Sequence, residues 1–296
     1  MARAEGASVP VTTWLVTGSG GQLGTELLEL LTGGQDTVVG VDRGDLDVTD
    51  RTAVHQLVGE VRPDVVVNCA AYTAVDRAES DPEAAMAVNG AAPGHLASAV
   101  AAHGSRLLHV STDYVFAGDA DRPYAEDAPT SPQSVYGVTK LAGERAVLET
   151  LPLGGFVVRT AWLYGAHGPN FVSTMLRLAE ERDTVDVVDD QLGQPTWARD
   201  LAAQLVLLAR SDATPGVYHG TSSGAVTWFG LTRKLFRLCG LDPDRVRPTT
   251  TAAFPRPAPR PAYSVLGHER WALAGLTEMR PWDVALAAYV ESLRSS

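Results

Sequence analysis

The chain has 296 residues, of which 45% are hydrophobic, so it can bury a sizeable core in one large domain or two modest ones. Lysine and arginine total 24 against 35 aspartate and glutamate residues, which gives a formal net charge of −11. This acidic balance argues against a nucleic-acid-binding protein, which would need a basic face. An anionic ligand stays compatible with it, because a helix N-terminus and a few arginines can bind phosphate locally.

Two cysteines, Cys69 and Cys239, are too few for a disulfide framework or a zinc site. The seven histidines form no His-Glu-x-x-His motif and no cluster with cysteine, so we expect no catalytic transition metal. No apolar run approaches the length of a membrane span, and the first residues lack the apolar core of a signal peptide. We therefore expect a cytoplasmic protein that binds no membrane, with residues 1–12 as a loose leader.

Strand-like apolar runs alternate with helical patterns through the first half of the chain. The predicted strands there cover residues 14–17, 37–41, 64–68, 106–110 and 155–159. The predicted helices cover residues 22–31, 51–61, 81–103 and 136–148. Strands spaced by helices imply right-handed crossovers and a parallel sheet, and continuous apolar runs are typical of strands covered on both faces. This half predicts an α/β fold with a Rossmann-like, doubly wound parallel sheet.

The pattern loosens after Tyr164. The predicted elements of this second half are helices at 171–182, 199–210, 227–239 and 282–293 and strands at 185–188 and 217–219. A proline-rich segment, 254–261, is too short to link independent domains. We interpret residues 13–165 as a dinucleotide-binding domain. Residues 166–296 are then mainly a smaller C-terminal substrate-binding lobe, with about 185–215 returning to the sheet.

A glycine-rich loop follows the first predicted strand and opens the first predicted helix. Gly18, Gly21 and Gly24 form the pattern G-x-x-G-x-x-G. Glycines let the chain turn tightly and approach a pyrophosphate, and the helix N-terminus supplies free N–H groups and a positive potential. Because the loop lies between a strand and a helix, we expect it to bind a dinucleotide rather than form an empty turn.

An acid at the end of the second predicted strand suits the ribose of such a cofactor. Asp42 would accept from a ribose 2′-hydroxyl and repel a 2′-phosphate. Arg43 follows directly and could offset that repulsion, so both NADH and NADPH are expected cofactors. Asp47 and Val48 could lie by the adenine, although a solvated loop acid is an equally good interpretation of Asp47.

The third predicted strand ends in small residues. Ala70, Ala71, Tyr72 and Thr73 follow it, and their size would allow a cofactor to approach closely. Ordinary packing of a helix on the sheet is the alternative explanation.

Tyr136 and Lys140 are four residues apart, which places both side chains on one helix face, roughly 6 Å apart along the axis. A phenol normally titrates near ~10, and a neighbouring ammonium favours the phenolate and lowers that pKa. A hydroxyl such as that of Thr112 could then bond the carbonyl oxygen that the phenol protonates. The set predicts ketone reduction, although Tyr-x-x-x-Lys alone is often only a solvated surface pair.

Together these elements resemble the extended short-chain dehydrogenase/reductase family, and within it the dTDP-4-dehydrorhamnose reductase branch. The resemblance covers nearly the whole chain after about residue 12. The segments that carry it are Asn68 to Glu79, Ser111 to Gly118, Val135 to Glu144, Arg159 to Tyr164, Asp190 to Thr196, and Arg260-Pro261 with Ser264 and Leu266.

The resemblance implies reduction of the C4 ketone of dTDP-4-dehydro-6-deoxy-L-mannose to dTDP-L-rhamnose with NADH or NADPH. Tyr136 would be the proton donor, Lys140 would lower its pKa and bond the nicotinamide ribose, and Thr112 would bond the substrate carbonyl. The sugar nucleotide would also contact Asp113 and Trp162, and Arg260 would lie near its diphosphate. The family's other cofactor positions fall on Gly21, Gln22, Leu23, Asp42, Asp47, Val48, Ala71, Tyr72 and Thr73.

The chain departs from the family in the proline-rich segment. The family often has two adjacent arginines before the proline, whereas Pro259 stands at the first of these positions, and Arg256 could substitute for it. A homodimer is an option, since some members form Mg2+-dependent dimers through acids near the C-terminus. Glu291 is the candidate acid here, but a glutamate on a terminal helix is usually only solvated.

Two other functions stay open. One is a 4-ketoreductase for another dTDP-deoxysugar, for example in dTDP-dihydrostreptose formation, because sugar stereochemistry is set by pocket shape. The other is a non-catalytic nucleotide-binding regulatory subunit, like the family member that regulates methionine adenosyltransferase. The presence of Thr112, Tyr136 and Lys140 together argues against the second.

Overall fold

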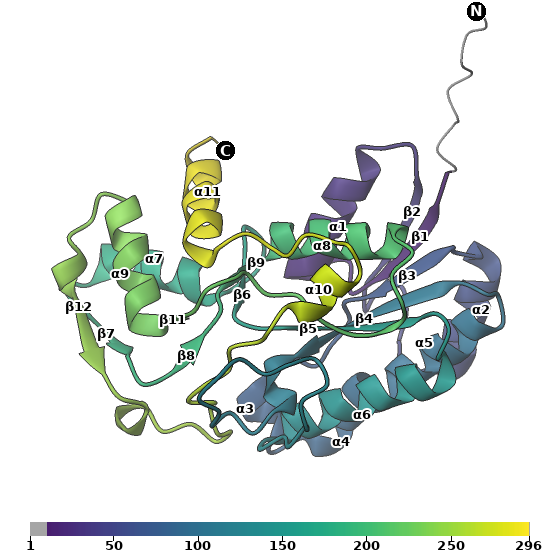
Figure 1. The fold of residues 1–296 in the computed structure, drawn as a ribbon, viewed down its shortest axis with the longest axis horizontal. Coiled ribbons are helices and arrows are strands. Elements are labelled where there is room, and N and C mark those ends of the chain that lie inside the picture. The colour runs from purple at the N-terminus through teal and green to yellow at the C-terminus, as the bar shows by residue number, and fades with distance from the viewer. Residues whose placement is uncertain (1–10, 296) are drawn as a thin grey trace, which may run out of the picture.

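Six parallel strands form the central sheet of the computed structural model, which describes residues 11–295 (Figure 1). Their order across the sheet is β2-β1-β3-β4-β5-β10, and each strand runs parallel to its neighbours. The bounds are β1 Thr13–Thr17, β2 Thr37–Val41, β3 Val65–Asn68, β4 Arg106–Thr112, β5 Gly155–Thr160 and β10 Gly216–His219.

Helices cover both faces of this sheet. They are α1 Gln22–Thr32, α2 Arg51–Val61, α5 Ala92–Ala101, α6 Val135–Thr150 and α8 Ala198–Arg210. On one face, α1 and α8 bury Leu27 and Leu205 against Trp14, whereas the next residue of β1, Leu15, packs with Leu96 of α5 on the other face. In Figure 1, α1 and α8 lie above the strands and α2, α5 and α6 below them. The predicted α/β fold with a doubly wound parallel sheet is confirmed.

The strand order places a topological switch point beside β1. This strand lies between β2 and β3, so the chain leaves the carboxyl ends of β1 and β3 towards opposite faces of the sheet. Loops that part in this way leave a crevice at the sheet edge, where doubly wound proteins bind their ligands.

The C-terminal lobe has its own hydrophobic core, to which Val185, Leu235, Phe236 and Leu286 contribute. Its helices are α7 Phe171–Glu181, α9 Trp228–Leu238 and α11 Trp282–Ser295. Helix α10 Glu269–Leu273 instead packs on the core of the central sheet through Trp271. Its strands are β6 Leu163–Tyr164, β7 Val185–Val188, β8 Leu192–Gly193, β9 Thr196–Trp197, β11 Val226–Thr227 and β12 Val246–Thr249. Figure 1 shows α7, α9, β7 and β12 on the side away from the central sheet.

The return of the chain to the central sheet is made by α8 and β10. Helix α8 packs on the sheet, and β10 adds a strand beside β5. The predicted return of about 185–215 is wrong for β7, which pairs with β12 inside the lobe. Val185 and Val187 of β7 are buried while Asp186 is exposed, so this strand is covered on one face only. Such alternation does not suit a strand that helices cover on both sides.

The long helix predicted over residues 81–103 is interrupted. It consists of α4 Pro82–Met86, a π-helical turn at Ala87–Ala91, and α5. The buried Asn89 lies in this turn, and its side chain accepts from Tyr72 N at 2.8 Å and donates to Tyr72 O at 3.1 Å. The wide turn therefore directs an amide at the loop after β3, which a regular helix pattern does not predict.

The predicted leader, residues 1–12, lies outside the described residues except for its last two. Thr12 is already part of the fold, because its amide donates to Asp36 Oδ1 at 3.1 Å. Within residues 11–295, no helix combines the length and the apolar character that crossing a membrane requires.

Candidate active site

A cavity of about 730 Å3 lies at the carboxyl ends of the central strands, next to the C-terminal lobe. All but two of the predicted site residues line it. These are Gly18, Gly21, Gln22, Leu23, Asp42, Arg43, Asp47, Val48, Ala70, Ala71, Thr73, Thr112, Asp113, Tyr136, Lys140 and Trp162. Its volume is in the range of cofactor and ligand pockets. The fold thus brings the glycine loop, the tyrosine–lysine pair and the predicted substrate residues to one cavity.

The glycine loop is shaped for a pyrophosphate. Gly18 has a φ of +68°, and a Cβ there would lie 2.7 Å from Ala70 N, so the loops after β1 and β3 touch only because this residue is glycine. Helix α1 begins after Gly21 with no side chain bonded to its first amides. Gly20 and Gly21 are exposed. Free N–H groups at an uncovered helix N-terminus fit the pyrophosphate of a dinucleotide.

The acids predicted to bind the adenosine half lie at the exposed end of the cavity. Asp42 Oδ1 accepts from Gly44 N at 2.7 Å, and Arg43 is exposed beside it. Asp47 Oδ1 accepts from Thr49 N at 2.9 Å and from Thr49 Oγ1 at 2.7 Å. These two bonds lower the pKa of Asp47 and hold its carboxylate in place. At the end of β2, Asp42 can therefore accept from a ribose hydroxyl, and Arg43 can donate to a phosphate.

Helix α6 presents Tyr136 at its first turn, where Ser134 caps the helix by accepting from Gly137 N. A Cβ on Gly137 would lie 2.2 Å from Tyr114 O, so only glycine lets the helix approach the segment after β4 this closely. That approach brings the Tyr136 phenol beside Thr112, which acts to lower the pKa of the phenol. Thr112 Oγ1 donates to Asp113 Oδ1 at 2.9 Å. Asp113, Thr112 and Tyr136 therefore lie together on the cavity wall.

Tyr136 and Asp113 both have raised pKa values. Burial of the phenol raises the pKa of Tyr136 to about 12; the Asp113 carboxylate adds to the rise, and Thr112 opposes it. Lys140 is not among the causes of this shift, so its predicted lowering effect stays a prediction, while the net shift is upward because burial dominates. Burial also raises the pKa of Asp113 to about 6. At neutral pH the phenol keeps its proton, which is the form that can donate one.

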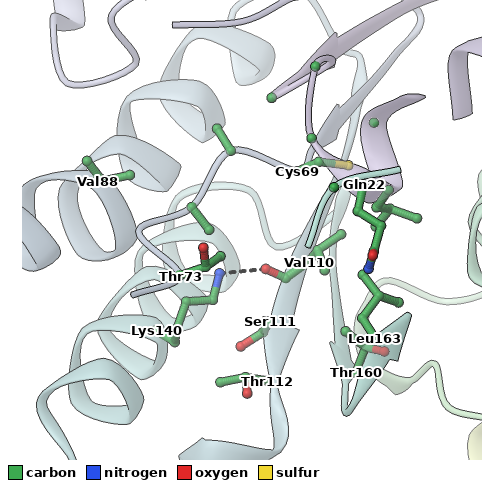
Figure 2. Close-up of a pocket in the computed structure, with 18 of the residues that line it drawn as sticks. Gln22, Cys69, Thr73, Val88, Val110, Ser111, Thr112, Lys140, Thr160 and Leu163 are labelled. Atoms are coloured by element: carbon green, nitrogen blue, oxygen red, sulfur yellow. Dashed lines mark hydrogen bonds between the residues drawn. The ribbon is translucent and has the colours of Figure 1, made fainter. Parts of the chain in front are cut away.

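Lys140 extends from α6 to the end of β4 (Figure 2). Its Nζ donates to Val110 O at 2.6 Å and lies 3.5 Å from His109 Nε2. The side chain is 2% exposed, and burial lowers its pKa to about 8. Figure 2 shows Gln22 and Leu163 across the cavity from it. The amine therefore lies at the inner wall of the cavity, with a pKa close to neutral.

Trp162 lines the cavity on the side of the C-terminal lobe. Its indole stacks on that of Trp228, with ring centroids 3.5 Å apart and planes at 6°, and Phe171 packs on Trp228 at 4.2 Å. The φ of Trp162 is +47°, in the left-handed region that a bulky residue rarely adopts. Such strain persists only where the surroundings fix the conformation. The stack therefore holds a flat aromatic surface at the cavity wall.

Two predicted site residues do not line the cavity. Tyr72 directs its hydroxyl to Asp81 Oδ2 at 3.1 Å, because Asn89 fixes its backbone on both sides. Arg260 donates to Asp76 Oδ2 at 2.9 Å and to Ala258 O at 3.0 Å. The structure therefore turns the Tyr72 side chain away from the cavity and pairs Arg260 with an acid.

The cavity also includes residues that the sequence interpretation did not assign to it. The principal ones are Cys69, Val75, Val88, Val110, Ser111, Tyr114, Thr160, Leu163, Gly168 and Pro169. Gly168-Pro169 is a loop signal that could have been used. Val88 had no usable signal, because its direction depends on the π-helical turn.

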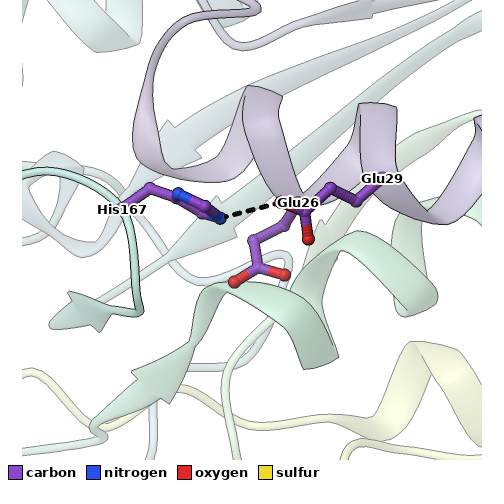
Figure 3. A group of neighbouring side chains, drawn as sticks. All are labelled: Glu26, Glu29 and His167. Carbon is purple, nitrogen blue, oxygen red and sulfur yellow. Dashed lines mark ion pairs between the residues drawn. The ribbon is translucent and has the colours of Figure 1, made fainter. Parts of the chain in front are cut away.

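A separate polar cluster lies beside α1 (Figure 3). His167 Nε2 and Glu29 Oε1 are 3.1 Å apart, and Glu26 lies beside them with its pKa raised, chiefly by burial. Their ligand atoms lie within 4.8 Å of one another, so the group could hold a cation. A histidine–carboxylate pair beside a buried acid explains the same arrangement without a metal, so we assign no metal ion to this group. Glu291, the candidate for a metal-binding acid, is exposed on α11.

Fold and site together define the class of protein. A doubly wound sheet with a glycine loop at its switch point, a Tyr-x-x-x-Lys helix and a second lobe beside the same cavity are the features of an extended short-chain dehydrogenase/reductase. The chain belongs to the RmlD substrate binding domain family, whose model matches residues 12–295.

Individual relatives share most of their length with this chain. It is 58% identical over 281 residues to a dTDP-4-dehydrorhamnose reductase of Streptomyces griseus, which covers 94% of this chain and 92% of the relative. It is 54% identical over 273 residues to a dTDP-4-keto-6-deoxy-D-glucose reductase of Streptomyces niveus, with 92% and 94% covered. The crystal structure of dTDP-4-dehydrorhamnose reductase from Bacillus anthracis with NADP superposes with a TM-score of 0.92 at 37% identity, covering 96% and 100%.

Proposed function

We propose that the protein reduces the C4 ketone of dTDP-4-dehydro-6-deoxy-L-mannose to dTDP-L-rhamnose with NADH or NADPH. The observation that carries the proposal is the common cavity of the glycine loop, Thr112, Tyr136, Lys140 and Trp162. Relatives named dTDP-4-dehydrorhamnose reductase match nearly the full chain, which supports this substrate.

The residues of the cavity account for the proton half of the reaction. A reduced nicotinamide, when bound, supplies the hydride that goes to the keto carbon. Tyr136 is protonated at neutral pH and gives its proton to the carbonyl oxygen, so the ketone becomes a secondary alcohol. Lys140 has a proton to replace the one that Tyr136 gives up. A positioned acid of this kind contributes ~10²–10⁴-fold to the rate.

Thr112 and Asp113 suit the sugar. Thr112 lies beside the phenol, so its hydroxyl can reach the same carbonyl oxygen after turning away from Asp113. Asp113 Oδ2 is buried and has no partner within hydrogen-bond distance among the described residues, although Ser264 and the Tyr114 amide are close enough to act on the pKa of this carboxyl. A buried carboxylate oxygen at a cavity wall is costly unless a ligand donates to it, and a sugar hydroxyl would do so. The flat indole of Trp162 offers a stacking surface to the sugar or the base.

The test is incubation of the purified protein with the keto sugar nucleotide and each reduced cofactor. Loss of the reduced-cofactor absorbance together with formation of dTDP-L-rhamnose would establish the activity. Absence of turnover with both cofactors would contradict it.

A second candidate is a 4-ketoreductase for another dTDP-deoxysugar. It is favoured by the relative at 54% identity, whose name gives a different sugar. The same assay with other dTDP-4-keto sugars decides between the two by comparing kcat/KM. A non-catalytic subunit would bind the cofactor and turn over none of them. The cytoplasmic location, the homodimer and the Mg2+ at its interface stay predictions from the sequence.

A further inference from the structure

A row of buried polar side chains connects three strands of the central sheet with Lys140. Thr17 of β1, Asn68 of β3 and His109 of β4 are direct cross-strand partners in the strand register. Thr17 Oγ1 donates to Asn68 Oδ1 at 2.7 Å, Asn68 Nδ2 lies 3.0 Å from His109 Nδ1, and His109 Nε2 lies 3.5 Å from Lys140 Nζ. None of these side chains is more than 2% exposed.

The backbone fixes which way the Asn68 amide faces. Ala70 N donates to Asn68 Oδ1 at 3.2 Å, and a backbone N–H can only donate. The amide oxygen must therefore face Ala70, so the amide nitrogen faces His109. Since the amide nitrogen is only a donor, His109 Nδ1 accepts. A neutral imidazole that accepts at Nδ1 carries its hydrogen on Nε2.

The hydrogen on Nε2 points at the amine of Lys140. A charged ammonium has three N–H groups and no lone pair, so it cannot accept from His109. A neutral amine has one lone pair and can accept, while it still donates to Val110 O at 2.6 Å. The orientation of the imidazole therefore favours the neutral form of Lys140 over the charged form.

The other surroundings of Lys140 shift its pKa in both directions. Burial lowers its pKa most strongly, whereas Glu144 on α6 and Cys69 at the end of β3 raise it. Burial and the charge of Lys140 together hold the pKa of His109 well below its usual range, so the imidazole stays neutral near neutral pH. Tyr136, which precedes Lys140 by four residues on α6, keeps its proton there too.

We propose that Asn68 and His109 are positioning residues that act through Lys140. Asn68 holds His109 in the tautomer with hydrogen on Nε2, and His109 presents that N–H to the lysine. Lys140 thereby becomes a stronger acid and a readier source of the proton that Tyr136 delivers. Only this last step rests on the proposed function; the tautomer and the acidity of Lys140 are properties of the protein alone.

The tautomer can be measured directly. In protein labelled with 15N-histidine, the nitrogen shifts of His109, assigned by comparison with His109→Gln, should report a neutral ring protonated at Nε2 from pH 6 to 9. A ring protonated at Nδ1, or an imidazolium, would overturn the proposal. This measurement needs no variant other than the one used for assignment, and no turnover.

The acidity of Lys140 can be measured too, because the sequence contains only two lysines, Lys140 and Lys234. Labelling lysine with 13C at Cε therefore gives two signals, and Lys234, which pairs with Asp283 on the surface of the lobe, is the internal reference. The Lys140 signal should titrate near pH 8.

Asn68→Asp should reverse the tautomer of His109. A carboxylate facing Nδ1 requires hydrogen on that nitrogen, which leaves Nε2 as an acceptor for the ammonium. The pKa of Lys140 should then rise by about one unit, or tenfold in its ionisation constant, and the alkaline limb of kcat should move with it. Thr17→Val, which leaves the bond from Ala70 N intact, should change neither. A raised pKa with the ring still protonated at Nε2 would assign the effect to the added charge and overturn the proposal.

Discussion

Arg260 donates a hydrogen bond from Nη2 to Asp76 Oδ2 at 2.9 Å, although the two residues are 184 positions apart. Asp76 lies on the short helix α3, Val75–Ala78, directly after the loop that follows β3. Its other oxygen accepts from Ala258 N at 3.3 Å, so one carboxylate holds both the arginine and the backbone of the proline-rich segment. Both charges also act on the buried Tyr114 at the cavity wall. The pair therefore attaches the proline-rich segment to α3, directly after the loop that follows β3.

Arg260→Ala should raise the KM for the sugar nucleotide about tenfold and leave kcat within about twofold. If Arg260 bonds the diphosphate, loss of that charge-assisted hydrogen bond costs about 1.5–3 kcal/mol, and such a contact would be equal in the ground and transition states. Steady-state kinetics at saturating cofactor would show it. Asp76→Ala separates the two roles of the arginine: if Arg260 contacts the diphosphate, Asp76→Ala should weaken binding less than Arg260→Ala does. Equal effects of the two variants would mean that Arg260 only anchors the segment, and an unchanged KM would rule out both roles.

The predicted and observed sites agree best where a residue's place follows from strand order. Gly18, Asp42 and Ala70 each follow a parallel strand, so their meeting at one sheet edge follows from the alternation of strands and helices. Tyr136 and Lys140 share a helix face because their spacing fixes it. These placements need only local periodicity and topology.

The differences between the predicted and the observed arrangement arise from tertiary contacts. The Tyr72 side chain turns to Asp81 because Asn89 lies in a π-helical turn, and no sequence period marks that turn. The pKa of Tyr136 rises because the phenol is buried, which the four-residue spacing to Lys140 does not reveal. Strand β7 joins the lobe because its partner, β12, comes much later in the chain.

Tyr136→Phe should lower kcat by about 10²–10⁴-fold while cofactor affinity changes little. The substitution removes the donated proton and keeps the ring, whose edge-to-face contact with Tyr114, at 5.5 Å between centroids, should hold it in place. Stopped-flow turnover and cofactor fluorescence titration would measure the two quantities. Tyr263→Phe, which removes a phenol outside the cavity-lining set, is the matched control. Turnover near that of the unsubstituted protein would refute the role of Tyr136.

Asp113→Asn should raise the free energy of unfolding at pH 7 by up to about 3 kcal/mol. Burial raises the pKa of Asp113 from 3.8 to about 6, so the folded state binds this proton more tightly than the unfolded state does. A pKa difference of about 2 corresponds to about 3 kcal/mol of free energy, because a difference of one corresponds to about 1.4 kcal/mol. The ionised carboxylate therefore opposes folding above pH 6, and this destabilisation disappears as the pH falls towards 4.

Urea unfolding from pH 4 to 8 would test whether Asp113→Asn raises the free energy of unfolding. The gain of Asp113→Asn should be largest at pH 7–8 and vanish near pH 4. Asp47→Asn is the control, because hydrogen bonds from Thr49 lower the pKa of that acid and the substitution should give no gain. If Asp113→Asn were destabilising at every pH, the bond from Thr112 would outweigh the cost of burying the charge.

Arg43→Ala should lower kcat/KM with NADPH about tenfold and leave kcat/KM with NADH within about twofold. Arg43 is exposed at the end of β2, beside Asp42, where the 2′ position of the adenosine ribose is expected. A guanidinium there can bond a 2′-phosphate, and a bond to a charged group is worth about 1.5–3 kcal/mol. Without it, Asp42 would still accept from a ribose hydroxyl and would repel the phosphate. Comparing both cofactors in one assay measures the ratio of the two kcat/KM values. Arg177→Ala is the control, because this exposed arginine of α7 is not among the residues that line the cavity. Equal losses with NADH and NADPH would show that Arg43 does not distinguish the two cofactors.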